Sequence, residues 1–143
     1  MKKLIFIPLV LFVFVLSGCS VSLDPDTSKL DQFVEVAEEM DDVFSEAVST
    51  FSELMEKDTL SADDQKTIVI EIDQLREAID EFKSTNAPFL VKTSKKVASK
   101  ALNKREEKLI KIQEKAKKGE ADKEDLDELI DLLSDDINIK LFD

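Results

Sequence analysis

The sequence predicts an all-α protein, an antiparallel bundle of three long helices followed by a short C-terminal helix. Apolar residues recur at alternating spacings of three and four positions over long stretches, which places them on one face of a helix. The 143 residues include only two glycines and three prolines. These are too few turn formers for the frequent tight turns of a sheet protein.

Residues 1–18 have the three parts of a bacterial export signal. The chain begins with a positively charged stretch, continues with an apolar run over residues 4–16, and then supplies the small residues Ser17 and Gly18 that a signal peptidase needs. The apolar run is shorter than the ~20 residues that cross the roughly 30 Å hydrocarbon core of a bilayer. A cleaved leader is therefore favoured over a retained membrane span.

The leader closes on Leu16-Ser17-Gly18-Cys19, which resembles the box that marks bacterial lipoproteins for lipid attachment. The resemblance implies a diacylglyceryl thioether on the Cys19 sulfur and cleavage between Gly18 and Cys19. The alternative is a free, exposed thiol. Cys19 is the only cysteine, so the chain can form no internal disulfide and no cysteine-based metal site.

These features divide the chain into three parts. We expect a lipoprotein signal peptide over residues 1–18, a lipidated N-terminus with a short linker over residues 19–25, and a helical bundle domain over residues 26–143. Two acyl chains form a stable anchor, since each buried methylene contributes ~0.8 kcal/mol. The mature protein is therefore expected on the cell membrane, at its extracytoplasmic face.

The first helix is expected to begin at Pro25, with Asp24 as its N-cap. Its core face has an unbroken heptad register, formed by Leu30, Phe33, Ala37, Met40, Phe44, Ala47, Phe51 and Leu54. Further apolar residues flank this seam: Val34, Val36, Val43, Val48 and Met55. So wide an apolar face fits a helix packed against two neighbours better than a two-stranded coiled coil.

The second helix is expected to follow Ser61, because an N-cap serine with Asp64 three residues later is close to a capping box. Its core residues are expected to be Ile68, Ile72, Leu75, Ile79 and Phe82. Pro88 disfavours a helical conformation at the residue before it, so this helix should end near Ser84. Phe89, Leu90 and Val91 are expected to fold back onto the core.

The third helix is expected from about Thr93 to Lys118, ending at Gly119. Its core residues are expected to be Ala98, Leu102, Leu109, Ile112 and Ala116. Arg105 occupies a core-facing position, and we expect its alkyl stem to lie along the core with its head in water. The alternative is a buried charge pair.

A short acidic helix is expected to begin at Asp122. It carries the apolar residues Leu126, Leu129, Ile130, Leu132 and Leu133, and residues 137–141 are expected to be extended or frayed. Asp125, Asp127 and Asp131 have the spacing of a calcium-binding loop, but Ile130 stands where such a loop requires glycine. No metal site is expected.

Charge is unevenly distributed along the chain. The net charge is −12, yet residues 90–118 hold 11 bases against 3 acids. One interpretation is that this basic helix packs between acidic helices and reduces their mutual repulsion. The other is that it presents an outer face to an anionic partner, either phospholipid headgroups or a phosphate-bearing wall polymer. The candidate residues for such a face are Lys92, Lys95, Lys96, Lys100 and Lys104.

Several residue types are missing, and their absence argues against an enzyme. The chain has no histidine, the usual general base, and its only glycine beyond the leader is Gly119, so it has no glycine-rich phosphate loop. Trp and Tyr are also absent. A nucleic-acid partner fits poorly with a strongly acidic domain in an extracytoplasmic compartment. No enzymatic activity and no cofactor are expected.

With its lipobox, three helical segments and the hinge over residues 82–88, the chain resembles the short helical lipoproteins of Gram-positive, Bacillus-type bacteria, which are mostly uncharacterised. It has a weaker similarity, in helical charged character alone, to a group called cell-wall-binding lipoproteins. The resemblance implies a membrane-anchored binding or accessory module at the cell envelope, with an envelope protein or an anionic wall polymer as partner. The alternatives are a phage-exclusion lipoprotein or a binder of anionic cell-wall polymer.

Overall fold

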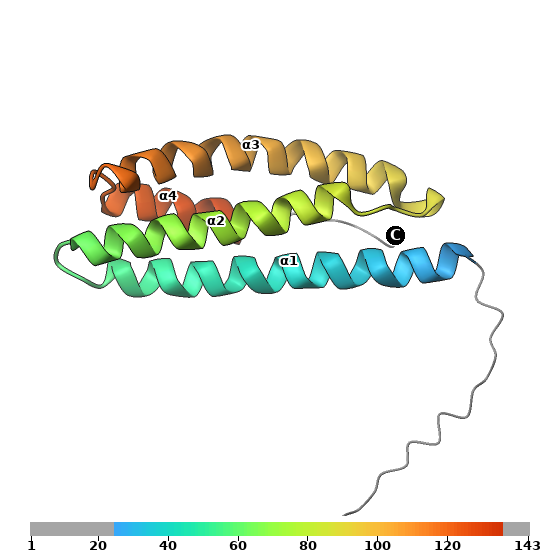
Figure 1. Ribbon diagram of the computed structural model, residues 1–143, viewed down its shortest axis with the longest axis horizontal. Coiled ribbons are helices and arrows are strands. Elements are labelled where there is room, and N and C mark those ends of the chain that lie inside the picture. The colour runs from blue at the N-terminus through green and yellow to red at the C-terminus, as the bar shows by residue number, and fades with distance from the viewer. Residues whose placement is uncertain (1–24, 136–143) are drawn as a thin grey trace, which may run out of the picture.

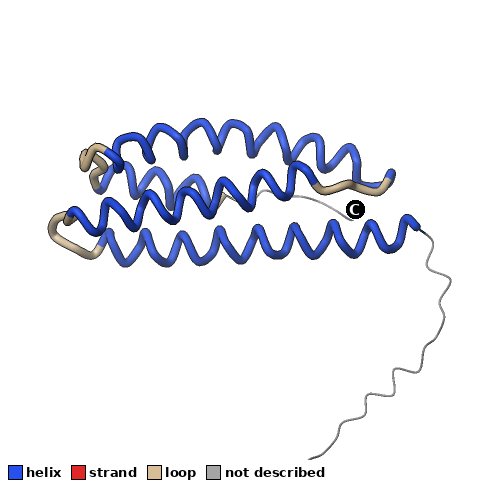
Figure 2. The backbone as a smooth tube through the Cα atoms, in the orientation of Figure 1, coloured by secondary structure: helices blue, strands red, loops and turns tan. Residues whose placement is uncertain are grey.

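The computed structural model describes residues 25–135, which form an all-helical bundle (Figures 1 and 2). The elements are α1 (Pro25–Met55), α2 (Ala62–Ser84), the 3₁₀ turn η1 (Phe89–Val91), α3 (Lys92–Lys117) and α4 (Lys123–Ser134). Consecutive helices run in opposite directions, as predicted. Over these residues, no helix is both long enough and apolar enough to cross a bilayer.

The heptad seam of α1 packs into the core as predicted, with one shift near its start. Six of its eight residues are buried: Phe33, Met40, Phe44, Ala47, Phe51 and Leu54. Leu30 and Ala37 are only half-buried, and Val36 is buried instead. The predicted N-cap, Asp24, lies outside the described residues.

The start of α2 has the predicted capping box. The Ser61 hydroxyl accepts from the Asp64 backbone N–H, and the Asp64 carboxylate accepts from the Ser61 backbone N–H. Two backbone donors that the helix itself leaves unpaired are thereby satisfied. All five predicted core residues of α2 are fully buried, and the helix ends at Ser84 as expected.

The prediction that the segment after Pro88 folds back onto the core is wrong for two of its three residues. Val91 is 2% exposed, but Phe89 is 82% exposed and Leu90 is 87% exposed. The reason is the tightness of η1, in which successive side chains point about 120° apart. Burial of Val91 therefore directs its two predecessors outward.

The third helix lies within one residue of its predicted bounds and ends at Lys117. Gly119, the predicted stop, follows two residues later with a φ of +74°, the left-handed conformation that favours glycine. All five of its predicted core residues are buried. Arg105 departs from the expectation that its head lies in water. The residue is 8% exposed, and its Nη2 donates to the carbonyl oxygen of Asp135 at 2.6 Å. Burial lowers the pKa of this guanidinium, although the Asp135 charge opposes the shift.

The fourth helix begins with a second capping box, between Asp122 and Asp125. Leu126, Leu129 and Leu133 are buried, while Ile130 and Leu132 pack half-buried against the core. The fourth helix packs mainly against α1. With 12 residues against the 26 of α3, it runs along only part of α3, since a helix rises about 1.5 Å per residue. It lies beside the C-terminal half of α3 (Figure 1). The predicted extended segment at 137–141 is outside the described residues.

Candidate binding surfaces

The two ends of the bundle have different surfaces. At one end lie the α1–α2 and α3–α4 loops with the two capping boxes, and we call it the capped end. At the other lie the start of α1, η1 and the start of α3 (Figure 1), and we call it the tip end. This placement decides which side chains meet.

At the capped end, charged and polar groups are paired with one another. Lys57 Nζ lies 2.5 Å from Asp64 Oδ1, and this hydrogen bond, with those from Ser61, lowers the pKa of Asp64 to about 2. The Gln65 side chain joins the two loops, because its Nε2 donates to the Ala121 carbonyl at 2.8 Å and its Oε1 accepts from the Ala121 N–H at 3.2 Å. These contacts tie the two loops of the capped end together through paired polar groups.

The C-terminal half of α3 is paired with α4. Lys108 Nζ lies 2.8 Å from Glu128 Oε1, and Lys115 Nζ lies 2.6 Å from Asp125 Oδ1. The hydrogen bond to Asp125 raises the pKa of Lys115, and the hydrogen bond from Lys108 lowers the pKa of Glu128. These two lysines neutralise acids of α4, in line with the first interpretation of the charge pattern. Lys111 and Lys118, in the same half, are exposed and form no salt bridge within the described residues.

The N-terminal half of α3 is different. Lys92, Lys96, Lys100 and Lys104 are exposed, and their spacing of four places them along one side of the helix. Within residues 25–135, none of the four forms a salt bridge, although pairs form elsewhere on α3. These four lysines are therefore exposed to solvent, which an outer face for an anionic partner would require.

Lys95 does not belong to this row. It is half-buried, and its Nζ donates to the carbonyl oxygen of Thr85, after the end of α2. Burial lowers its pKa. Of the five lysines predicted for an anionic-partner face, Lys95 holds the α2–α3 connection while the other four face solvent.

The sequence pattern did not reveal the exposed apolar residues at the tip end. Phe89 and Leu90 in η1, with Val97 on the second turn of α3 at 65% exposed, are the three most exposed large hydrophobic side chains among the described residues. The sequence feature that could have indicated their exposure is the position of Phe89 and Leu90 between Pro88 and the lysine-rich start of α3. Exposed apolar residues beside cations are typical of a surface that binds a protein, a membrane or a ligand.

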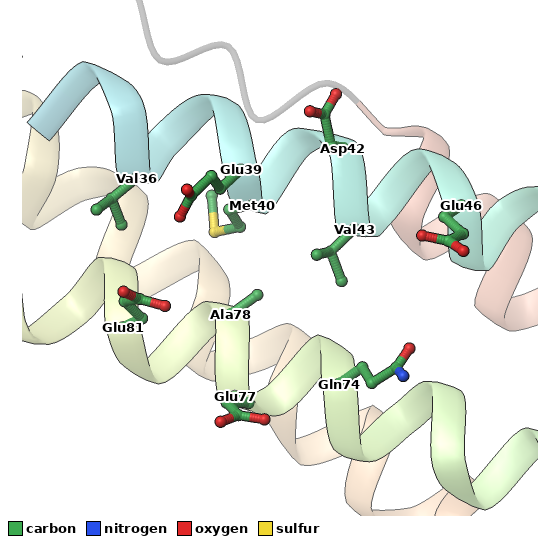
Figure 3. A pocket seen from close by; sticks show the side chains of 10 residues that line it. All are labelled: Val36, Glu39, Met40, Asp42, Val43, Glu46, Gln74, Glu77, Ala78 and Glu81. Atoms are coloured by element: carbon green, nitrogen blue, oxygen red, sulfur yellow. The ribbon is translucent and has the colours of Figure 1, made fainter.

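An acidic groove between α1 and α2 was also missed. Figure 3 shows Val43 on α1 and Ala78 on α2 pointing toward each other across it, with Glu39, Glu46 and Glu81 along its sides. Asp42 and Glu77 also line it, but they point away from the opposite helix in this view. The carboxylates do not converge, and in the described part of the chain no group of acidic, histidine or cysteine side chains is arranged to hold a metal ion.

Glu71 on α2 is also close to an acidic residue of α1. Its burial raises the pKa of its carboxyl group, and the negative charge of Glu46 on α1 raises it further. Excess negative charge thus lies on the α1–α2 side of the bundle, and excess positive charge lies on the outer side of α3. The surface charge is divided by helix, as the sequence pattern indicated.

The predicted lipidation site, Cys19, and the peptidase-recognition residues Leu16, Ser17 and Gly18 lie outside the described residues. Comparison with known proteins finds no matching family model, no similar curated protein and no similar solved structure. Function is therefore inferred from the residues themselves.

Proposed function

We propose that the protein is a lipid-anchored lipoprotein of the cell membrane, acting at its extracytoplasmic face as a binding or accessory module of the envelope. The observation that carries this proposal is Leu16-Ser17-Gly18-Cys19 at the end of a charged and then apolar leader. The bundle suits such a role, since its helices have their own buried core. The anchor would be supplied by the segment that precedes α1.

The proposed role is binding and not catalysis. The chain has no histidine and no glycine-rich loop, and the polar groups at the capped end pair with one another. Surfaces open to a partner include the lysine row on α3, the acidic groove and the exposed apolar residues of the tip end. A row of cations without partners in the described chain favours an anionic ligand, as in a binder of wall polymer or of lipid headgroups.

The anchor is tested by metabolic labelling of the full chain with an alkyne fatty acid in a Bacillus-type host. Wild type should be labelled and shortened by its leader. Cys19→Ala should carry no label and keep residues 1–18, because lipidation of the cysteine is what permits cleavage. Ser20→Ala, next to the box, is the matched control and should behave as wild type. Equal labelling of wild type and Cys19→Ala would refute the anchor.

A further inference from the structure

The two most exposed large apolar side chains in the described part of the protein are adjacent. Phe89 and Leu90 in η1 are 82% and 87% exposed, while the neighbouring Val91 is buried. A folded domain gains by removing such side chains from water, yet no element of the bundle covers them. Val97, on the second turn of α3, is also exposed, at 65%.

Positive charge borders this apolar pair on the α3 side. Lys92 and Lys96 are exposed in the first turns of α3, and Lys100 continues the row one turn later. No acidic residue lies between position 82 and position 105. The tip of the α2–α3 connection is thus an apolar pair followed by cations, which is the composition of a segment that binds an anionic membrane interface.

The tip end is also the end to which the anchor would attach. The start of α1 lies at the same end of the bundle as η1 (Figure 1), and the chain from Cys19 to Pro25 can span at most about 20 Å. A lipid on Cys19 would therefore hold η1 close to the bilayer. This step rests on the proposed function.

We propose that the tip end docks on the anionic membrane that holds the anchor, with Phe89 and Leu90 inserted at the headgroup level and Lys92, Lys96 and Lys100 against lipid phosphates. A hydrophilic wall polymer could satisfy the lysines but gives Phe89 and Leu90 nothing apolar to contact. A lipid surface satisfies both.

In the proposed docked state, we expect the acidic start of α1 to be kept away from the anionic bilayer. Glu35, Glu38 and Glu39 are exposed there, and Figure 1 shows α2 between α1 and α3, the helix that carries the lysine row. Docking through α3 turns these acids away from the bilayer. At physiological salt, the repulsion between these acids and the anionic lipids decays over a Debye length of about 8 Å. The linker between Cys19 and Pro25 can span more than this distance, so it can hold the acids beyond the range of the repulsion.

The absence of Trp and Tyr makes insertion directly measurable. Phe89→Trp in the mature, lipidated full chain gives a single fluorophore at the tip. The chain is reconstituted into vesicles of phosphatidylcholine alone or mixed with phosphatidylglycerol, with and without brominated acyl chains as quenchers. We expect a blue-shifted emission that brominated lipid quenches in the anionic vesicles. Ile70→Trp, an apolar α2 position that is 56% exposed, is the matched control and should remain unquenched.

Charge reversal in the same reporter tests the lysines. The double change Lys92→Glu and Lys96→Glu is made in the Phe89→Trp protein. The ratio of docked to undocked protein should fall by at least about fivefold per lysine, and the denaturation midpoint should be unchanged. Phe89→Trp quenched no more than Ile70→Trp would refute docking, as would an emission shift with soluble polyglycerol phosphate but not with vesicles. Lipid labelling at Cys19 is read separately, so an anchored chain with an unquenched tip would refute docking alone.

Discussion

The capped end and the tip end of this bundle are built from the same kinds of residue but use them differently. At the capped end, Lys57 and Lys115 lie within 2.6 Å of carboxylates that are themselves nearly buried. At the tip end, Lys92 and Lys96 face solvent beside exposed Phe89 and Leu90. Net charge and composition therefore do not define a binding surface. What matters is which charges the fold has already paired.

The length of α4 explains why lysines in one half of α3 form ion pairs and those in the other half do not. Its 12 residues lie beside the C-terminal half of α3 and supply Asp125 and Glu128 to the lysines there. Within residues 25–135, no lysine in the N-terminal half of α3 forms a salt bridge, and the one ion pair between α2 and α3 joins Lys83 of α2 to Glu106 of α3. Internal neutralisation and an outward cationic face are therefore both present, in different halves of one helix.

The largest expected effect compares leucines at the two ends. Leu126, in the first turn of α4, is fully buried, and Leu90 is 87% exposed. Leu126→Ala should lower the free energy of unfolding by about 2 to 5 kcal/mol, through lost burial and the cavity left behind. Leu90→Ala should change it by no more than about 0.5 kcal/mol. Urea denaturation measures both, and equal losses would show that η1 packs against the fold after all.

The next effect tests the polar link between the two loops of the capped end. Gln65→Leu removes both hydrogen bonds to the buried Ala121 backbone. An unpaired buried backbone group costs roughly 1 to 3 kcal/mol, so we expect a loss of stability in that range. Gln74→Leu, at an exposed position of the same helix, is the matched control. A Gln65→Leu variant as stable as this control would mean that the loops hold together without the link.

A smaller effect concerns pH. Because the pKa of Asp64 is lowered from its usual 3.8 to about 2 in the folded protein, its contribution to stability is complete above about pH 4 and is lost as pH falls toward about 2. Asp64→Asn should therefore be less stable than wild type near neutral pH, and the gap should close over that acidic window. Denaturation midpoints across the window measure it. Asp63→Asn, at the exposed neighbouring residue, is the matched control for the loss of one carboxylate in this turn. A gap between Asp64→Asn and wild type that stays constant with pH would contradict the assigned cause.

The helices could be predicted from the sequence because each depends on local signals. Seams with spacings of three and four, the capping residues Ser61 and Asp122, and the stop at Gly119 gave bounds close to those observed. These features act within a single helix or its ends. No knowledge of the neighbouring helices was needed.

The errors concern relations between elements. A hydrophobic run such as Phe89 to Val91 does not show which of its side chains a tight turn directs inward. The Arg105 position indicated core contact but not the Asp135 carbonyl that accepts its hydrogen bond. The acidic groove needs residues from two helices at once, and the division of the lysines needs the length of α4. Each is fixed by packing, which one sequence does not display.

The fold pairs Lys108 and Lys115 of α3 with acids of α4 and leaves the lysines at the tip end for an outside surface. Thermal unfolding of two matched double reversals at low and high salt tests this central claim most directly. Lys108→Glu with Lys115→Glu should lower the melting temperature, by roughly 4 °C or more at low salt and by less at high salt, where the new repulsion with Glu128 and Asp125 is screened. The double variant Lys92→Glu and Lys96→Glu should have the wild-type melting temperature at both salt concentrations. Equal, salt-dependent losses in the two variants would contradict the claim, because the tip lysines would then be neutralising the bundle itself.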